Sequence, residues 1–424
     1  MPAVDVINLK NNELDKTRDF ALAFVGVSFS SCFLPRSQAW CYLASEDLRN
    51  VVRTVNALGS DYTGRLHILL NDTSKENVSR NIVLLLILGA MPNDAVAADI
   101  ALHFWYSVFL PEEYRLRILA SLVLVLQQYI DKTEPLCVNL GLRAKLTCLV
   151  PREITDQLLY TAGPTLSTSR ARNEYARVNA TLARLDARNG ALEGLKPRHR
   201  LAFMAFWRSG VVLPFSVDSD HYTAPNTSFF SPSGTWLPNN VENPFASWEY
   251  VTKVSTFTLY ADAGHVHCSP NEVVKTGQAH GTQPEDIYGC LYFYLSDQLQ
   301  KFAKRIRELD VTFHVFNMSA HTLARDILGG QYSRCGLTPS VRFNRVDLAY
   351  TLADPGYMRD VLKSWTPLLA EGDTAAIVGV FSDWTDSQKD GSVVGLDEAA
   401  VAPIVGKLMK LGRVRSFVRQ TWWH

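Results

Sequence analysis

The pattern of apolar and polar runs near the amino terminus predicts a strand followed by a helix. Residues 39–44 form a short apolar run that is typical of a buried parallel strand. The run ends at Ser45, Glu46 and Asp47, and carboxylates of this kind favour the start of a helix. Apolar residues then recur at helical spacing along residues 47–58, and a glycine follows at the position of a C-cap.

The same pattern is repeated directly afterwards. A strand-like run ends in Asn71 and Asp72, and the strongly apolar helix that follows carries Glu76 in its first turn. In an open α/β sheet the ligand crevice lies at the carboxyl ends of the strands. We therefore expect this acidic turn and the turn that holds Ser45 to face the same site.

Later runs extend the predicted sheet. Three strand-like runs stand near the carboxyl terminus, at residues 310–317, 341–350 and 374–381. A helical pattern separates the last two, and strands that alternate with helices imply a mainly parallel sheet. We predict an α/β protein with a Rossmann-type sheet, in which Asn317 and Asp347 are further candidate substrate-binding residues.

Four segments follow from this assignment. Residues 1–38 are a lead-in packed on the core, with its apolar part against the edge of the sheet, and residues 39–130 are the first half of the Rossmann-type domain. Residues 131–309 are a helical and loop-rich insertion that lies outside the sheet. Residues 310–424 supply the second half and a basic tail.

Two stretches concentrate positive charge in a chain whose formal net charge is zero. One is an amphipathic helix predicted between residues 169 and 200, where four arginines share one side of a helical wheel: Arg170, Arg177, Arg184 and Arg188. The other, residues 401–424, contains no acid and includes Lys407, Lys410, Arg413 and Arg415. Each stretch is either a solvated surface or a contact for a phosphate backbone, and we assign both to RNA binding.

Composition narrows the remaining possibilities. The 424 residues are 47% hydrophobic, enough for a large core, and no apolar run reaches the roughly 18 residues of a membrane span. We therefore expect a cytoplasmic protein with no membrane contact. Seven cysteines without paired spacing favour reduced thiols over a disulfide framework. The cluster of His265, His267 and Cys268 lacks a fourth ligand, and His103 has no partner nearby in sequence, so we expect no metal site.

Several motifs resemble those of a large fungal family of uncharacterised proteins, many of which carry a MYND zinc finger. The motifs are LASEDLRNVV at 43–52, LLND at 69–72, VSRN at 78–81, ALHFWY at 101–106, PNTSFFSP at 225–232 and FNRVD at 343–347. A related amino-terminal domain occurs in an axonemal dynein assembly factor. The resemblance implies a methyltransferase-like Rossmann fold, although this chain has no MYND finger and carries Glu46 where a glycine is usual.

A stand-alone fungal chain of this kind is also similar to the arginine-containing cyclodipeptide synthases, which condense two aminoacyl-tRNAs. That resemblance implies a transferase of secondary metabolism with aminoacyl-tRNA as its partner and no cofactor. Ser45 is then the candidate acceptor of an aminoacyl group. The candidate substrate-binding residues are Glu46, Asp47, Asn71, Asp72, Glu76, Asn317 and Asp347.

Two other classes of function compete with this one. A methyltransferase that uses S-adenosylmethionine is favoured by the acid after the second strand. It is disfavoured by the turn at Ser45, which has no glycine and holds two acids, Glu46 and Asp47, that would repel the carboxylate of the cofactor. A non-catalytic assembly or regulatory protein would need only the fold. We favour the aminoacyl-tRNA enzyme, because it alone uses both basic stretches.

Overall fold

The computed structural model describes residues 15–26, 48–129, 135–149, 151–163, 166–237, 270–349, 355–372 and 374–379, and residues 7, 9 and 244. The strand predicted at residues 39–44 lies outside these ranges. So do Ser45, Glu46 and Asp47, the cluster at His265, and the carboxyl-terminal basic stretch from residue 401.

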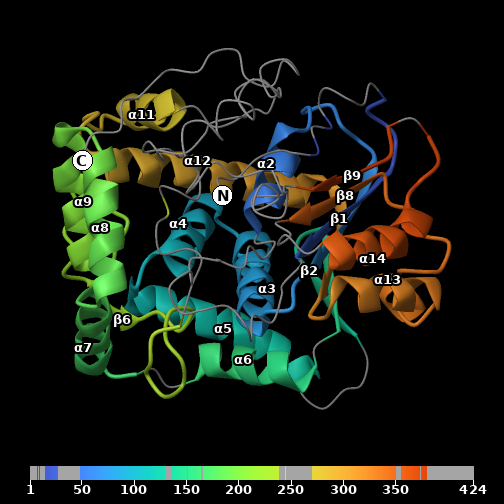
Figure 1. Cartoon of the computed structure of the whole chain (residues 1–424), viewed down its shortest axis with the longest axis horizontal. Coiled ribbons are helices and arrows are strands. Elements are labelled where there is room, and N and C mark those ends of the chain that lie inside the picture. Colours follow the sequence, from blue (N-terminus) through green and yellow to red (C-terminus); the bar gives the residue numbers. More distant parts are fainter. Residues whose placement is uncertain are drawn as a thin grey trace, which may run out of the picture.

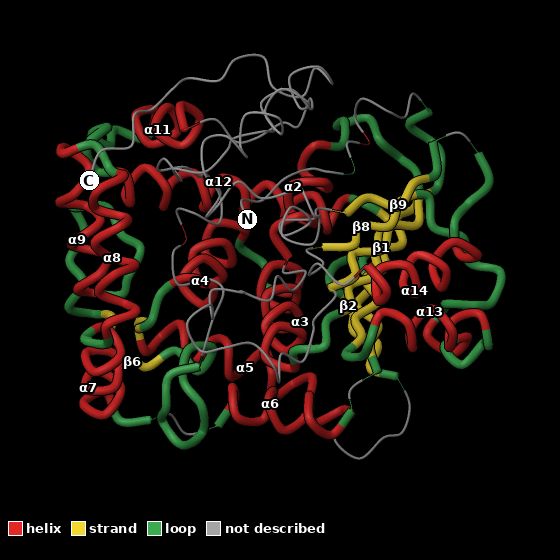
Figure 2. Tube along the Cα trace, viewed as in Figure 1, coloured by secondary structure: helices red, strands yellow, loops and turns green. Residues whose placement is uncertain are grey.

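A seven-stranded sheet organises the described part of the chain (Figure 2). Its strand order is β4-β5-β7-β2-β1-β8-β9, and every neighbouring pair is parallel except β4 and β5. The strands are β1 (Phe20–Gly26), β2 (Arg65–Asn71), β4 (Leu136–Asn139), β5 (Lys145–Cys148), β7 (Asp310–Phe316), β8 (Arg345–Ala349) and β9 (Ala376–Gly379). The prediction of an α/β protein with a mainly parallel sheet is confirmed.

Strand β1 lies inside the sheet, between β2 and β8, so the expectation that this segment packs against the sheet edge is wrong. Leu22 pairs with Ile68 on one side and with Arg345 on the other. The sequence of β1 explains the position, since its side chains are apolar toward both faces: Leu22 and Phe24 belong to one core cluster, and Ala23 and Val25 belong to the other. A parallel strand covered on both faces reads as a continuous apolar run.

The segment predicted to lie outside the sheet contributes its far edge. Strand β5 pairs in parallel with β7, so that Leu146 lies opposite Phe313, and β4 pairs with β5 as an antiparallel hairpin. The expectation that residues 131–309 lie wholly outside the sheet is therefore wrong for these two strands. Each is four residues long, which is too short for a clear period-2 pattern.

Helices cover both faces of the sheet (Figure 1). One face is covered by α13 (Ala320–Leu328) and α14 (Pro355–Trp365), whose apolar side chains share the smaller core with Val346 and Leu348. The opposite face carries the larger core. Its helices are α2 (Leu48–Ala57), α3 (Lys75–Ala90), α4 (Asp94–Tyr106), α5 (Glu112–Tyr129), α6 (Arg152–Ala162), α9 (Arg200–Ser209), α11 (Pro270–Ala279) and α12 (Ile287–Glu308).

The predicted basic helix is two helices. Helix α7 (Thr168–Asn179) ends at Ala180, and α8 (Leu182–Gly194) begins after Thr181. The helical wheel that aligned the four arginines therefore does not hold across the break. A two-stranded sheet of β3 (Phe109–Pro111) and β6 (Tyr222–Pro225) links this part to α4 and α5. No helix in the described ranges is long and apolar enough to cross a membrane.

Candidate functional site

The carboxyl ends of β2 and β7 are joined by asparagine side chains. Asn71 Nδ2 donates to the Met318 carbonyl oxygen over 2.9 Å, and Asn71 Oδ1 accepts from the Met318 backbone N–H over 3.3 Å. In the opposite direction, Asn317 Nδ2 at the end of β7 donates to the Asp72 carbonyl oxygen over 2.8 Å. The structure thus brings these predicted residues together at one point of the carboxyl edge.

The Asp72 carboxylate is buried and organises the start of α3. Its Oδ1 accepts from the Ser74 backbone N–H over 2.7 Å, and its Oδ2 accepts from Asn77 Nδ2 over 3.4 Å. Ser74 is the N-cap, because its hydroxyl accepts from the Asn77 backbone N–H and donates to Glu76 Oε2 over 3.0 Å. Asp72 therefore stabilises the helix terminus, whereas Glu76 is half-buried at its first turn.

A second polar contact stands on the other side of β1. Asp347, on β8, is buried, and its Oδ2 accepts from Asn50 Nδ2 of α2 over 3.4 Å. The alternation along β8 directs Asp347 toward α2, because Val346 and Leu348 face the opposite core. Asn50 lies in the first turn of α2, where the positive end of the helix dipole favours a carboxylate.

These two polar groups flank the position where an open α/β sheet binds its ligand. From β1 the sheet extends through β2 on one side and through β8 on the other, so that the order reverses at β1. A crevice is expected outside the carboxyl ends of the strands at such a reversal. Asp72 directly follows β2 and Asp347 lies on β8, and β1 separates these two strands.

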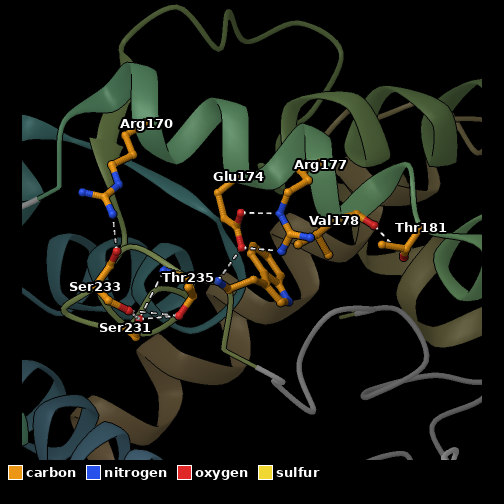
Figure 3. Close-up of polar contacts among 9 residues, drawn as sticks. Arg170, Glu174, Arg177, Val178, Thr181, Ser231, Ser233 and Thr235 are labelled. Atoms are coloured by element: carbon orange, nitrogen blue, oxygen red, sulfur yellow. Dashed lines mark hydrogen bonds and ion pairs between the residues drawn. The ribbon is translucent and has the colours of Figure 1, made fainter. Parts of the chain in front are cut away.

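Two arginines of α7, Arg170 and Arg177, are engaged with neighbouring groups (Figure 3). The guanidinium of Arg170 donates to the Ser233 carbonyl oxygen, which holds the loop after β6. Arg177 forms a bidentate pair with Glu174, with N–O distances of 2.6 and 2.8 Å. Glu174 also accepts from the Trp236 backbone N–H over 2.9 Å. The pKa of Glu174 is lowered, chiefly by the Arg177 hydrogen bond.

Arg184 and Arg188 belong to α8. The Arg184 guanidinium carbon lies 5.1 Å from the ring centre of Trp207 and 5.4 Å from that of Trp236, a cation–π arrangement that ties α8 to α9 and to the loop. Arg188 is half-buried and donates to Asn189 Oδ1 over 3.4 Å. The four arginines therefore do not form one free stripe, although they all lie on the same helical unit.

The sequence did not reveal a cluster around His103. This fully buried histidine contacts the Ser107 hydroxyl through Nδ1 at 2.9 Å and the Tyr222 hydroxyl through Nε2 at 3.1 Å. Asp99 Oδ1 lies 3.6 Å from Nε2. Tyr292 donates to the same Asp99 oxygen over 2.7 Å, and Tyr114 donates to the other.

Asp99 carries the negative charge of this cluster. Burial alone would raise its pKa, but the hydrogen bond and charge of His103, with the tyrosine hydroxyls, lower the pKa of Asp99 to about 2. The cluster joins α4, α5, β6 and α12. The spacing of Asp99 and His103, four residues apart on one helix, was a visible signal, but the tyrosines lie far away in sequence.

Residues 1–110 match the family model of a domain of unknown function (DUF4470). No curated protein and no solved structure matches the chain. The matched region runs from β1 through α4 and includes Asn71, Asp72 and Glu76, whereas Asp347 and the basic helices lie beyond it. Within the described residues, no group of three or more His, Cys, Asp or Glu side chains could hold a metal ion.

Proposed function

We propose that this chain is an aminoacyl-tRNA-dependent enzyme that forms peptide bonds, similar to the arginine-containing cyclodipeptide synthases. Its frame is a Rossmann-type sheet. The strands β7, β2, β1, β8 and β9 are neighbours in that order, and numbered along the chain among themselves they read 3-2-1-4-5, the order of a doubly wound dinucleotide-binding sheet. The segment between β2 and β7 supplies the helical insertion, including α7 to α9.

One observation carries the proposal, namely the placement of acids on both sides of β1, after β2 and on β8. Asp72 and Glu76 follow β2, and Asp347 lies on β8. An arginyl group presents a planar guanidinium with five donors, which pairs best with carboxylates in a partly dry site. Because Asp72 is committed to the turn before α3, Glu76 and Asp347 are the acids we assign to the arginyl side chain, and Asp72 positions Glu76.

The reaction assigned to the site is acyl transfer without any redox step. The Ser45 hydroxyl oxygen attacks the ester carbonyl carbon of the aminoacyl-tRNA, the ester bond to the terminal ribose breaks, and the proton passes to that ribose oxygen. The amino group of a second aminoacyl-tRNA then attacks the new ester, so that a peptide bond forms and Ser45 regains its proton. The free amino group of the resulting dipeptidyl-tRNA attacks its own ester carbonyl, which closes the ring, and the ribose oxygen of the second tRNA leaves with the proton. In sequence, Ser45 stands three residues before α2, whose first turn contacts Asp347.

Helices α7 to α9 supply the surface proposed for the tRNA backbone. The exposed cations on these helices and on the segment between α8 and α9 include Arg172, Lys196, Arg198 and Arg200. Arg170, Arg177 and Arg184 shape this surface by holding the loop with Trp236, and Arg188 extends it on α8. A polyanion releases counterions on binding such a surface, so its affinity falls with salt.

The direct test is mass spectrometry of small molecules made by a host that expresses the chain. We expect a cyclic dipeptide that contains arginine. Glu76→Gln and Asp347→Asn should remove this product while the purified variants stay folded by circular dichroism. Glu113→Gln is the matched control, because Glu113 also lies in the first turn of a helix, α5, which follows β3 of the separate two-stranded sheet. Absence of a cyclic dipeptide in a host with abundant arginyl-tRNA would overturn the proposal.

S-adenosylmethionine is the alternative ligand, favoured by the strand order and by an acid after β2. In that case Asp72 would bind the ribose hydroxyls of the cofactor. Both Asp72 carboxylate oxygens already accept hydrogen bonds from the α3 turn, which is why we prefer the first proposal. Equilibrium dialysis with labelled S-adenosylmethionine separates the two, since only a methyltransferase should retain it and lose it in Asp72→Ala.

A further inference from the structure

A cavity of about 570 Å³ lies at the β4–β5 edge of the sheet, apart from the polar groups around β1. Strands β4 and β5 form one side, and the segment after α13, which includes the 3₁₀ turn η3 (Ser333–Cys335), forms the other. The lining residues are Pro135, Cys137, Thr147, Arg334, Cys335 and Gly336. This volume is far larger than an ion requires and falls within the usual range for small organic ligands.

Side chains of three neighbouring strands form a row along one side of the cavity. Cys137 pairs with Thr147 across β4 and β5, and Thr147 pairs with His314 across β5 and β7. Residues paired in register point to the same face of a sheet. The row therefore leads from the exposed Cys137 thiol, past the Thr147 hydroxyl, to a buried imidazole.

His314 is a buried histidine that lies next to the cavity lining. It is 1% exposed, and its Nε2 lies 3.5 Å from His67 Nδ1, while its own Nδ1 has no hydrogen-bond partner of normal geometry among the described residues. A Cβ at Gly336, which lines the cavity with φ +86°, would lie 3.6 Å from His314 Cε1. Cε1 is bonded to both ring nitrogens, so this edge of the imidazole lies next to the cavity lining at Gly336.

We propose that this cavity binds a small organic carboxylate, with the carboxylate at Arg334 and hydrogen bonds from the ligand body to Thr147 and His314. Among the described lining residues, Arg334 alone carries a guanidinium, which is exposed and matches one carboxylate. Burial, together with the charge of His67, lowers the pKa of His314 to about 3, although the Cys335 backbone weakly opposes this. The ring is therefore neutral near pH 7. Its Nδ1 donates or accepts one hydrogen bond with the ligand, according to the tautomer.

Cys137 makes the cavity testable, because it is exposed and lines the cavity. The full chain is treated with a negatively charged or a neutral methanethiosulfonate, and modification at Cys137 is followed by peptide mass spectrometry, with buried Cys148 as an internal reference. The Cys137 thiolate attacks the reagent sulfur, a mixed disulfide forms and methanesulfinate leaves. We expect Arg334→Gln to lower the rate ratio of anionic to neutral reagent about threefold to tenfold. Arg342→Gln, an exposed arginine outside the lining, should leave the ratio unchanged.

Protection by a carboxylate tests binding itself. Succinate, citrate and glutamate are added up to about 50 mM against chloride of matched ionic strength, and the neutral reagent reports on Cys137. We expect at least one of them to slow the modification, and Thr147→Val, which keeps the shape of the side chain, to weaken that protection. If none of the three protects Cys137 and Arg334→Gln leaves the reagent ratio unchanged, the cavity is not a carboxylate site. Neither result depends on aminoacyl-tRNA chemistry.

Discussion

Helices α3 and α8 are held in the fold in opposite ways. Every residue of α3 from Asn77 to Gly89 is buried, because the helix packs between the sheet and helices α4, α5, α6 and α12. Helix α8 has no buried residue at all and exposes 80% of Leu182. Burial of apolar surface stabilises the first helix, whereas the second packs only half-buried side chains such as Leu192 on the core and places Arg184 between two tryptophan rings. A helix with so little buried surface contributes little to the stability of the fold.

The largest expected effect separates these helices by stability. Leu85→Ala on α3 removes a fully buried side chain from a packed layer and should lower the free energy of unfolding by about 2–5 kcal/mol. Leu182→Ala on α8 should change it by no more than about 0.5 kcal/mol, because the side chain is already in solvent. Urea denaturation of both variants measures the difference. A comparable loss in Leu182→Ala would show that α8 is covered by another part of the chain.

A second prediction concerns the cluster that joins α4 to the helical unit. The pKa of Asp99 is lowered to about 2, so its ionised form stabilises the fold above the ordinary pKa of 3.8, and this contribution disappears as pH falls through about 2. The shift corresponds to about 2 kcal/mol. Asp99→Asn should therefore destabilise the protein near pH 6, and the gap to wild type should close as the pH approaches 2.

Denaturant titrations at several pH values measure this gap. Asp297→Asn is the matched control, since Asp297 also lies beside a histidine, His280, but at the surface. Its difference from wild type near pH 6 should be smaller. A constant gap for Asp99→Asn between pH 6 and pH 2 would contradict the lowered pKa.

The third prediction compares how much the two acids of the β2–α3 turn contribute to stability. Asp72→Ala removes acceptors for the Ser74 backbone N–H and for Asn77, and should cost about 1–2 kcal/mol of stability. Glu76→Ala loses only the contact with the Ser74 hydroxyl and should stay within about 0.5 kcal/mol. Thermal unfolding followed by circular dichroism distinguishes them. Equal losses would mean that Glu76 is as structural as Asp72, which removes it from the proposed arginyl site.

The features that depend on residues close together in the sequence were predicted correctly. Asp72, Ser74 and Glu76 lie within five residues, so their place at a helix start could be read from the pattern, and α2 and α3 lie where the apolar spacing predicted them. The order of the strands in the sheet was not predicted, because it depends on pairing between segments that are far apart in the sequence. The central position of β1 depends on contacts with β2 and β8, and no local pattern orders strands within a sheet.

The same limit applies to the site. Asn50 and Asp347 are 297 residues apart, so neither residue alone indicated the contact. The four arginines do not form the continuous stripe that the sequence predicts, for a different reason. A helical wheel assumes an unbroken helix, and it ignores Glu174, which stands three residues before Arg177 and offsets its charge.

The smallest expected effect compares two arginines of α7 in RNA binding. Both are exposed, but Arg177 is paired with Glu174, whereas Arg172 lies over the Phe109 ring at 5.2 Å. A phosphate that binds Arg172 releases a condensed counterion, so Arg172→Gln should reduce the slope of log affinity against log salt by about 0.7–0.9. Arg177→Gln should change the slope less, because Glu174 competes with the phosphate for the guanidinium. Filter binding of unfractionated tRNA at several salt concentrations measures both slopes. Equal slopes in wild type and both variants would place the RNA contact elsewhere than α7.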